Sequence, residues 1–295
     1  MPLTLTRRTV LAGAIAAALP IPAQAAGLSA ADIKATEAKF AAIEARIGGR
    51  MGVAVLDSGS GTSIGHRADE QFAMCSTFKF LAAAAVLKKV DAGQAKLDQR
   101  MPLSASDIIP YAPVAEKHLA NGGMTLGEAC AAAVEWSDNV AGNLMLRELG
   151  GPEGLTTFMR AIGDDKTRLD RNEPTLNTAI PGDPRDTTTP HAVTQSLQKI
   201  LLGPVLSESS RAQAERWLAG CRTCDTRLRA GLPSGWQIGD KTGTGGNASV
   251  NVIGIVRPPQ RAPLLVAVYC TGSPKTTKEI EVAHVEVARL VATVF

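Results

Sequence analysis

The sequence predicts an α/β fold of the α+β type: a five-stranded antiparallel sheet flanked by the two terminal helices, with a large all-helical lobe inserted. Three observations lead to this prediction. Strand-like segments lie near both ends of the chain, helical periodicity fills the middle, and a helical segment stands at each end. Neither group of strands is large enough to form a stable sheet alone, so both are expected to share one sheet. A site is then expected in the cleft between the two lobes.

Residues 1–25 have the features of an export signal peptide. Arg7-Arg8 precede a small and apolar run from Thr9 to Ile21, and Ala23-Gln24-Ala25 offers a cleavage site. The run is too short to span a membrane. The arginine pair resembles a twin-arginine signal, and the alternative is an ordinary secretory leader that contains two arginines. Either route predicts a periplasmic protein.

A helix is expected next, at 28–47, because Ser29 can cap its start and Gly48-Gly49 can end it. Two strands are expected at 51–57 and 61–67, separated by a short segment of serine and glycine that favours a hairpin. These elements form the N-terminal part of the predicted α/β lobe.

The middle of the chain has helical patterning, and we predict a helical lobe at 72–219. Within it, Thr125 and Glu128 have the spacing of a capping box before a helix at 129–136. Thr189-Pro190 predicts the start of another helix, because proline is favoured at the first helical position.

Strand patterning then returns in three apolar segments, at 236–244, 249–256 and 264–270, and a helical segment follows at 278–295. The α/β lobe is therefore predicted to comprise residues 26–71 and 220–295. Its five strands have short connections and are expected to be antiparallel.

The composition excludes some classes of function. The 295 residues are 45% hydrophobic and 20% charged, which suits one large globular unit or two closely joined ones. The formal net charge is +3, and it falls to +1 without the two arginines of the signal. A nearly neutral chain offers no electrostatic case for nucleic acid or an anionic membrane. We expect a monomer with neither partner.

The chain has five cysteines, an odd number, so at least one is unpaired or pairs between chains. They are Cys75, Cys130, Cys221, Cys224 and Cys270. Cys221 and Cys224 form a C-x-x-C pattern, but no second pair and no histidine cluster accompanies it, so zinc is not expected. We interpret these two as unpaired loop cysteines rather than a redox pair.

Ser76 stands just before an apolar helical run, and Lys79 follows three residues later. Residues three apart share one face of a helix, so the pair is either a helix start with a buried lysine or a nucleophile beside its base. Two further motifs help to decide. Ser137-Asp138-Asn139 lies between two helical segments, and Lys241-Thr242-Gly243 lies in a predicted strand. These three motifs in this order are typical of class A β-lactamases and penicillin-binding proteins.

On these motifs the sequence resembles the class A serine β-lactamases along essentially all of the mature chain, including chromosomal enzymes of environmental Gram-negative bacteria. The resemblance implies hydrolysis of the β-lactam ring of penicillins and cephalosporins through a serine acyl-enzyme, which confers antibiotic resistance. It implies no cofactor and no metal. The alternatives are a penicillin-binding DD-peptidase or transpeptidase, and a sensor domain that binds β-lactams without hydrolysing them.

The resemblance implies a role for each motif residue. Ser76 would be the nucleophile, and Lys79 can act as its base if burial favours the neutral amine. Ser137 would pass a proton to the leaving β-lactam nitrogen. The backbone N–H groups of Ser76 and Thr244 would form an oxyanion hole.

The same resemblance predicts the substrate contacts. Asn139 would hold the side-chain amide of the substrate, and Tyr111 would stand at the rim of the cleft. Lys241, with the hydroxyls of Thr242 and Thr244, would attract the substrate carboxylate.

One segment separates a hydrolase from the penicillin-binding alternatives. Residues 171–177 match the Ω-loop motif of class A enzymes, which we expect at about 168–183. Glu173 would act there as general base for deacylation, and Asn177 would help it to hold the attacking water. Arg171 and Asp183 match the ion pair that closes this loop in the family.

The sequence also departs from the family pattern. Many relatives carry an arginine where this chain has Val250, and a minority supply it from the position of Arg227. We expect replacement of Arg227 to lower activity without changing the melting temperature. Cys75 and Cys130 lack their usual partners, because Gly245 and Ala83 stand there, so both are predicted to be free, buried thiols. The missing Cys75 bridge argues against carbapenem hydrolysis.

Overall fold

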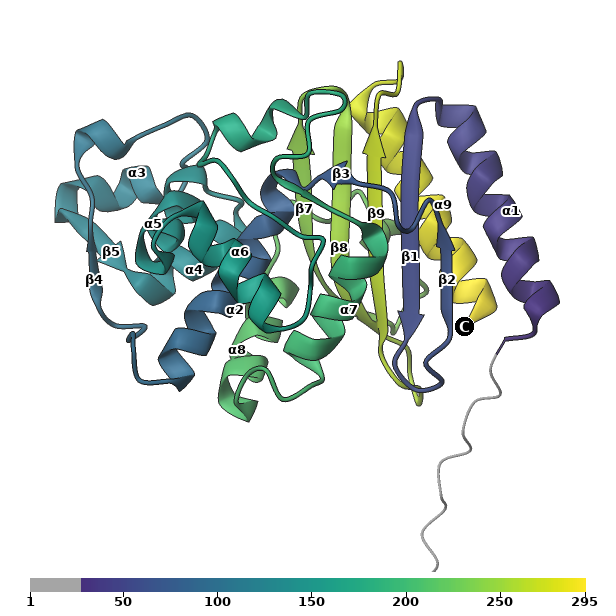
Figure 1. The fold of residues 1–295 in the computed structure, drawn as a ribbon, viewed down its shortest axis with the longest axis horizontal. Coiled ribbons are helices and arrows are strands. Elements are labelled where there is room, and N and C mark those ends of the chain that lie inside the picture. The colour runs from purple at the N-terminus through teal and green to yellow at the C-terminus, as the bar shows by residue number, and fades with distance from the viewer. Residues whose placement is uncertain (1–27) are drawn as a thin grey trace, which may run out of the picture.

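The computed structural model describes residues 28–295, so the predicted signal peptide lies outside the described residues. Its main sheet has five strands, all antiparallel, in the order β2-β1-β9-β8-β7 (Figure 1). They are β1 (Arg50–Asp57), β2 (Ser63–His66), β7 (Gln237–Gly245), β8 (Ser249–Arg257) and β9 (Leu264–Thr271). The predicted sheet, shared by the two ends of the chain, is confirmed.

The two terminal helices, α1 (Ala30–Ile47) and α9 (Thr277–Val294), lie side by side on one face of this sheet (Figure 1). Ser29 and Thr276 cap them, because each side chain accepts a backbone N–H of the first turn. Thr276 makes a full capping box with Glu279. The Ser29 cap was predicted from the sequence, and the Thr276 cap was not.

Helical structure dominates between β2 and β7. The helices are α2 (Phe78–Asp91), α3 (Ala115–His118), α4 (Leu126–Glu135), α5 (Asn139–Leu149), α6 (Pro152–Ala161), α7 (Pro190–Leu201) and α8 (Glu208–Ala219). Two short sheets accompany them, pairing β3 (Phe72–Ala73) with β6 (Thr187–Thr188) and β4 (Arg100–Pro102) with β5 (Gly123–Thr125). The Thr125–Glu128 capping box is present, and Thr189 caps α7 as expected.

The main sheet separates two hydrophobic cores. Successive residues of β9 alternate between them: Val266 and Val268 face α1 and α9, whereas Leu265 and Ala267 face the other helices. On that second side, α2 is buried on all sides from Phe78 to Leu87. A helix that is apolar all round belongs in the interior. The residues at its N-terminus are therefore held rigidly against the sheet.

One prediction about the cysteines is corrected by the structure. Cys221 and Cys224 form a disulfide, with their Cα atoms 5.9 Å apart, so their interpretation as unpaired loop cysteines is wrong. The tight turn after α8 brings the two sulfurs together, which spacing alone did not reveal. Cys75, Cys130 and Cys270 are free and buried, which confirms the prediction for the first two.

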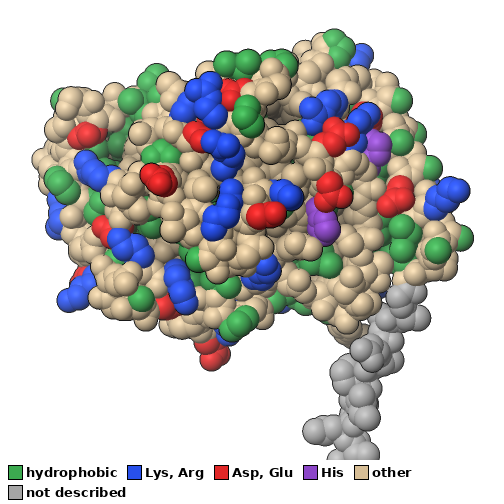
Figure 2. Space-filling view, in the orientation of Figure 1, with side chains coloured by type: hydrophobic (Ala, Val, Ile, Leu, Met, Phe, Trp, Pro, Cys, Tyr) green, Lys and Arg blue, Asp and Glu red, His purple; other side chains and the backbone are tan. Residues whose placement is uncertain are grey.

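The surface is consistent with the small net charge. Figure 2 shows basic and acidic side chains intermixed across the visible face, without a patch of one sign. Among residues 28–295, no helix has both the length and the apolar character needed to cross a membrane.

Candidate active site

A cavity of about 350 Å³ lies where β7 faces the N-terminus of α2 and the loop before α5. It is lined by Ser76, Tyr111, Ser137, Asn139, Asn177, Thr223, Arg227, Thr242, Gly243 and Thr244. The other predicted site residues, Lys79, Glu173 and Lys241, lie directly behind this lining and are buried. The structure thus brings together all the site residues that the sequence predicted.

Ser76 lies in the 3-10 turn Cys75–Thr77 that leads into α2. Cys75 holds the left-handed φ of 47°, an uncommon conformation for a residue other than glycine. Gly243 of β7 passes very close to this turn. A Cβ there would lie 2.7 Å from the carbonyl oxygen of Met74 and 3.2 Å from the backbone nitrogen of Ser76. Glycine is therefore required for the strand to approach the serine.

Lys79 connects the three groups around Ser76. Its Nζ lies 3.0 Å from Ser76 Oγ, 2.9 Å from Glu173 Oε1 and 2.7 Å from both Ser137 O and Asn139 Oδ1. The side chain is fully buried. Burial lowers the pKa of Lys79, although the Glu173 carboxylate opposes this shift. A lowered pKa makes the neutral amine, which can accept a proton, more accessible.

Glu173 completes the cluster, with Oε1 3.4 Å from Ser76 Oγ. Its other oxygen accepts a hydrogen bond from the Asn177 side-chain amide. Its backbone is held by Asn143, whose amide accepts from Glu173 N at 2.9 Å and donates to Glu173 O at 3.0 Å. No sequence motif indicated Asn143, which lies one helical turn after Asn139 on α5.

Arg171 makes the predicted ion pair that closes the Ω-loop, with Asp183, and also a shorter one that was not predicted, with Asp186. Arg171 Nε lies 2.5 Å from Asp186 Oδ2, whereas its Nη2 is 3.7 Å from Asp183. Asp183 instead pairs with Arg185 at 2.8 Å. Asp186 is fully buried and also accepts the backbone N–H groups of Asp170 and Arg171. The expected Arg171–Asp183 contact is thus the weaker of two.

Ser137 faces Lys241 across the cleft. Lys241 Nζ lies 2.9 Å from Ser137 Oγ and 2.8 Å from the carbonyl oxygen of Thr242. Burial, together with the nearby Lys79 and Arg227 charges, holds the pKa of Lys241 well below its usual value. Ser137 has a left-handed φ of 61°, and the buried Asp138 fixes this loop by capping α5 and accepting two backbone N–H groups.

Asn139 and Tyr111 form the wall on the α5 side. Asn139 Oδ1 accepts from Lys79, and its Nδ2 donates to the carbonyl oxygen of Pro110 at 2.9 Å. The Tyr111 side chain stands at the rim, where the residue is 56% exposed. A tyrosine that closed the core would be buried, so the rim position agrees with the predicted one.

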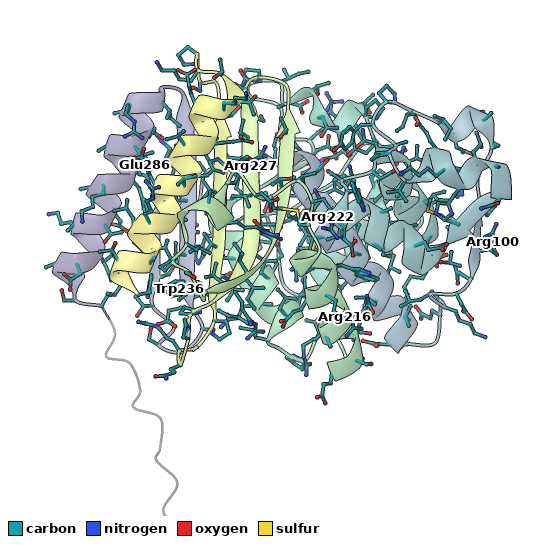
Figure 3. All side chains as sticks on the ribbon, turned by 180° about the vertical axis from the view of Figure 1, so that it is seen from behind. Arg100, Arg216, Arg222, Arg227, Trp236 and Glu286 are labelled. Carbon is teal, nitrogen blue, oxygen red and sulfur yellow. A yellow bond between two sulfur atoms is a disulfide. The ribbon has the colours of Figure 1, made fainter. Side chains whose placement is uncertain are left out.

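Arg227 is not a solvated surface residue, because it is only 4% exposed. Figure 3 shows it among the side chains between α9 and the sheet. It donates to the Thr244 hydroxyl at 2.8 Å and to the carbonyl oxygens of Gly243 and Asn251 at 3.0 and 2.5 Å. Its Nε also pairs with Glu281 of α9 at 3.2 Å. These buried contacts lead us to expect that removing Arg227 lowers stability, in place of the unchanged melting temperature expected from the sequence.

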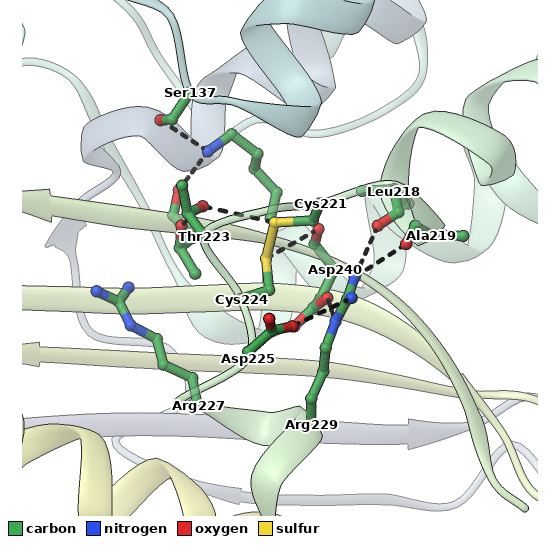
Figure 4. The surroundings of a disulfide bond; sticks show 12 residues. Ser137, Leu218, Ala219, Cys221, Thr223, Cys224, Asp225, Arg227, Arg229 and Asp240 are labelled. Carbon is green, nitrogen blue, oxygen red and sulfur yellow. Dashed lines mark hydrogen bonds and ion pairs between the residues drawn. A yellow bond between two sulfur atoms is a disulfide. The ribbon is translucent and has the colours of Figure 1, made fainter. Parts of the chain in front are cut away.

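Thr223 is a second site residue that was not predicted. Its hydroxyl lies 2.6 Å from that of Thr242 and lines the cavity (Figure 4). Thr223 lies between the two cysteines of the C-x-x-C pattern. That pattern was therefore a signal for this part of the site, although its cysteines were interpreted as unpaired.

The fold, with a buried serine–lysine–glutamate cluster at the end of a cleft, defines a serine hydrolase of the acyl-transfer type. Residues 35–295 match the model of the β-lactamase enzyme family. Beta-lactamase CTX-M-25 of Escherichia coli is 52% identical over 235 residues, 80% of each chain. Beta-lactamase OXY-2 of Klebsiella oxytoca is 45% identical over 94% of this chain and 95% of its own.

Solved structures agree. The ancestral (GNCA) class A β-lactamase superposes with a TM-score of 0.87 at 52% identity, covering 88% of this chain and all of the other. The class A β-lactamase of the last common ancestor of Gram-negative bacteria (GNCA4) superposes with a TM-score of 0.87 at 54% identity, covering 88% of this chain and 98% of the other. The chain belongs to the β-lactamase enzyme family. It is a class A serine β-lactamase that hydrolyses β-lactams, as the resemblance implied.

Proposed function

We propose that Ser76 attacks the β-lactam carbonyl and that Glu173 directs the water that later hydrolyses the resulting ester. The observation that carries this proposal is the buried triangle of Ser76 Oγ, Lys79 Nζ and Glu173 Oε1, whose sides are 3.0, 2.9 and 3.4 Å. A serine hydroxyl needs an adjacent base to attack, and both other corners lie within reach of its proton.

The proton then travels to the leaving nitrogen through Ser137. Its backbone oxygen accepts from Lys79, and its hydroxyl accepts from Lys241, so it lies between the base and the open cleft. The developing oxyanion is held by the backbone N–H groups of Ser76 and Thr244. Gly243, the residue before Thr244, allows β7 to approach the serine turn closely enough for both groups to contribute.

Lys241 attracts the substrate carboxylate. Lys79 is paired with Glu173, and Arg227 with Glu281, so Lys241 is left without an acidic partner among residues 28–295. A substrate carboxylate supplies the missing charge and raises the pKa of Lys241 again. Thr242, Thr244 and Arg227 complete this end of the cleft, which we name the carboxylate end.

The other end of the cleft holds the substrate side chain. Asn139 Nδ2 has a second proton beyond the one given to Pro110, and Asn177 Oδ1 is buried without a partner in the described part of the chain. One donor and one acceptor suit a side-chain amide, with Tyr111 packing at the rim.

Two measurements test these roles. Mass spectrometry after mixing with a penicillin should show transient addition of the intact drug, and Ser76→Ala should show none. Steady turnover of a chromogenic cephalosporin tests the extension to cephalosporins, because a single burst would contradict it. We further propose that the mature enzyme is monomeric and periplasmic. Its cleft lies between an α/β lobe, formed by residues 26–71 and 220–295, and a helical lobe, formed by residues 72–219.

A further inference from the structure

The segment that follows α8 forms one wall of the carboxylate end. It contains the disulfide between Cys221 and Cys224, and two cavity-lining residues, Thr223 and Arg227, lie within it or just after it. Figure 4 shows the disulfide beside Thr223. The covalent bond thus closes the turn that presents the threonine.

Thr223 connects the disulfide to the substrate site. Its Oγ1 lies 2.6 Å from Thr242 Oγ1 and 3.5 Å from Cys221 Sγ. The carbonyl oxygen of Thr242 in turn accepts from Lys241 at 2.8 Å. A shift of Thr223 would therefore change the hydroxyl pair next to the cation that is proposed to bind the carboxylate.

The disulfide is also anchored to the sheet and to Arg227. Cys224 Sγ lies 3.4 Å from the carbonyl oxygen of Asp240 in β7, and Cys224 O accepts the backbone N–H of Arg227 at 3.2 Å. Cys221 is 2% exposed and Cys224 is fully buried. Two unbonded sulfurs cannot stay at bonding distance, so breaking the bond lets the two side chains separate and removes the covalent closure of the turn.

We propose that the Cys221–Cys224 disulfide is a clamp that positions Thr223 at the carboxylate end, so that substrate binding weakens when the pair is reduced. Reduction by a dithiol breaks the S–S bond, forms two S–H groups and converts the dithiol to its own disulfide. Thr223 and the disulfide act through Thr242 and are positioning residues. The inference rests on the proposed carboxylate end.

The primary experiment compares the air-oxidised enzyme with the enzyme reduced by dithiothreitol, using benzylpenicillin and its methyl ester. Alkylation and mass spectrometry establish how many thiols are free in each sample. EDTA is present, because the sulfurs and a carboxylate oxygen of Asp240 lie within 4.8 Å of one another and can hold a metal ion after reduction.

Reduction should raise KM for benzylpenicillin about two- to tenfold, the range of one ordinary hydrogen bond, with kcat nearly unchanged. KM for the methyl ester should not respond, because it carries no carboxylate. A general loosening of the fold would affect both substrates. Equal KM values for oxidised and reduced enzyme on benzylpenicillin would overturn the clamp.

Variants separate the threonine from the disulfide. Thr223→Val keeps the bond and removes the hydroxyl, so it should raise KM like reduction does, and Thr223→Ser should restore it. Cys221→Ser with Cys224→Ser should show the raised KM and no response to dithiothreitol, whereas Cys130→Ala, a buried thiol elsewhere, should respond like the wild type. A wild-type KM in Thr223→Val would overturn the proposal even if the double variant does not fold.

The ester comparison also separates this inference from the proposal on which it rests. If oxidised wild-type enzyme binds the acid and the ester equally well, the carboxylate end itself is misassigned. If the enzyme prefers the acid but its KM is the same in the oxidised and reduced states, only the proposed role of the disulfide is wrong.

Discussion

Lys79 and Glu173 form a fully buried ion pair, with Nζ 2.9 Å from Oε1 and neither side chain exposed. Removing two charges from water is costly, and the attraction between them offsets that cost only with good geometry and further hydrogen bonds. Here Lys79 has three more acceptors, and Glu173 has Asn177. Such a pair can exchange a proton with Ser76 without water, which explains why two groups can compete for the role of base.

Glu173→Ala should form the acyl-enzyme and then stall, because the base for the attacking water is gone while Lys79 can still activate Ser76. Mass spectrometry after mixing with a penicillin should show protein plus intact drug for many minutes. Asp165→Ala is the matched control, since that carboxylate is 80% exposed and should turn over normally. Wild-type turnover in Glu173→Ala would remove Glu173 from its assigned role.

His284 should make the fold sensitive to acid. It is fully buried in α9, 3.5 Å from Cys270 Sγ, and burial lowers its pKa to about 3. A depressed histidine pKa means that the folded state excludes a proton that the unfolded state accepts. Above the unfolded pKa of about 6.5 the histidine is neutral in both states, and the free energy of unfolding does not depend on its protonation. As the pH falls from about 6.5 towards 3, the unfolded state binds the proton and the free energy of unfolding decreases.

The expected slope from this one group is about 1.4 kcal/mol per pH unit at most. His284→Gln should lower the melting temperature at pH 7 through lost packing, yet show a shallower decline from pH 6.5 to 4.5. Thermal melts across this range measure it. The wild-type protein, melted over the same pH range, gives the reference curve. Parallel curves for His284→Gln and wild type would contradict the assignment.

Export should depend on the two arginines near the N-terminus. Replacing Arg7 and Arg8 by lysine keeps the charge but removes the pair that a twin-arginine route requires. We expect active enzyme to remain in the cytoplasm, measured as β-lactam hydrolysis in fractionated cells. Undiminished periplasmic activity would indicate the general secretory route.

The sequence predicted the elements of the fold well because the signals are local. The apolar runs of β8 and β9, the Thr125–Glu128 box and the Ser29 cap each depend on neighbours along the chain. The site was reachable because its three motifs have fixed spacing. Local patterns of this kind need no knowledge of how distant segments pack.

What the sequence missed depends on contacts between distant segments. Asp186 makes the shorter ion pair with Arg171 because the chain buries it there. Asp183 and Asp186 lie at similar distances from Arg171 along the sequence, so spacing alone could not rank them. The disulfide could not be predicted because it depends on the conformation of the turn after α8, which brings the two sulfurs together. Asn143 holds the Glu173 backbone from α5, 30 residues earlier in the chain, so no local pattern indicates the contact. Burial of Arg227 likewise follows from α9, far along the chain.

Arg227→Ala should lower kcat/KM on penicillins about ten- to a hundredfold. A charged hydrogen bond contributes roughly 1.5–3 kcal/mol, which corresponds to that range. Unlike a surface arginine, Arg227 also holds the carbonyl oxygens of Gly243 and Asn251 and pairs with Glu281, so its loss leaves buried groups unpaired and should lower the melting temperature. Arg185→Ala, at a position 48% exposed, should change neither quantity.

Lost activity and lost stability can be separated by returning the charge from another position. Val250 of β8 lies directly opposite Thr244 of β7. The backbone of an arginine at position 250 would therefore be next to Thr244, whose hydroxyl Arg227 contacts. Val250→Arg in the Arg227→Ala background should recover part of kcat/KM on penicillins, whatever its melting temperature. Recovery should be absent for the methyl ester, which has no carboxylate to attract. If Arg227→Ala keeps full activity on penicillins, Lys241 binds the carboxylate without a second cation.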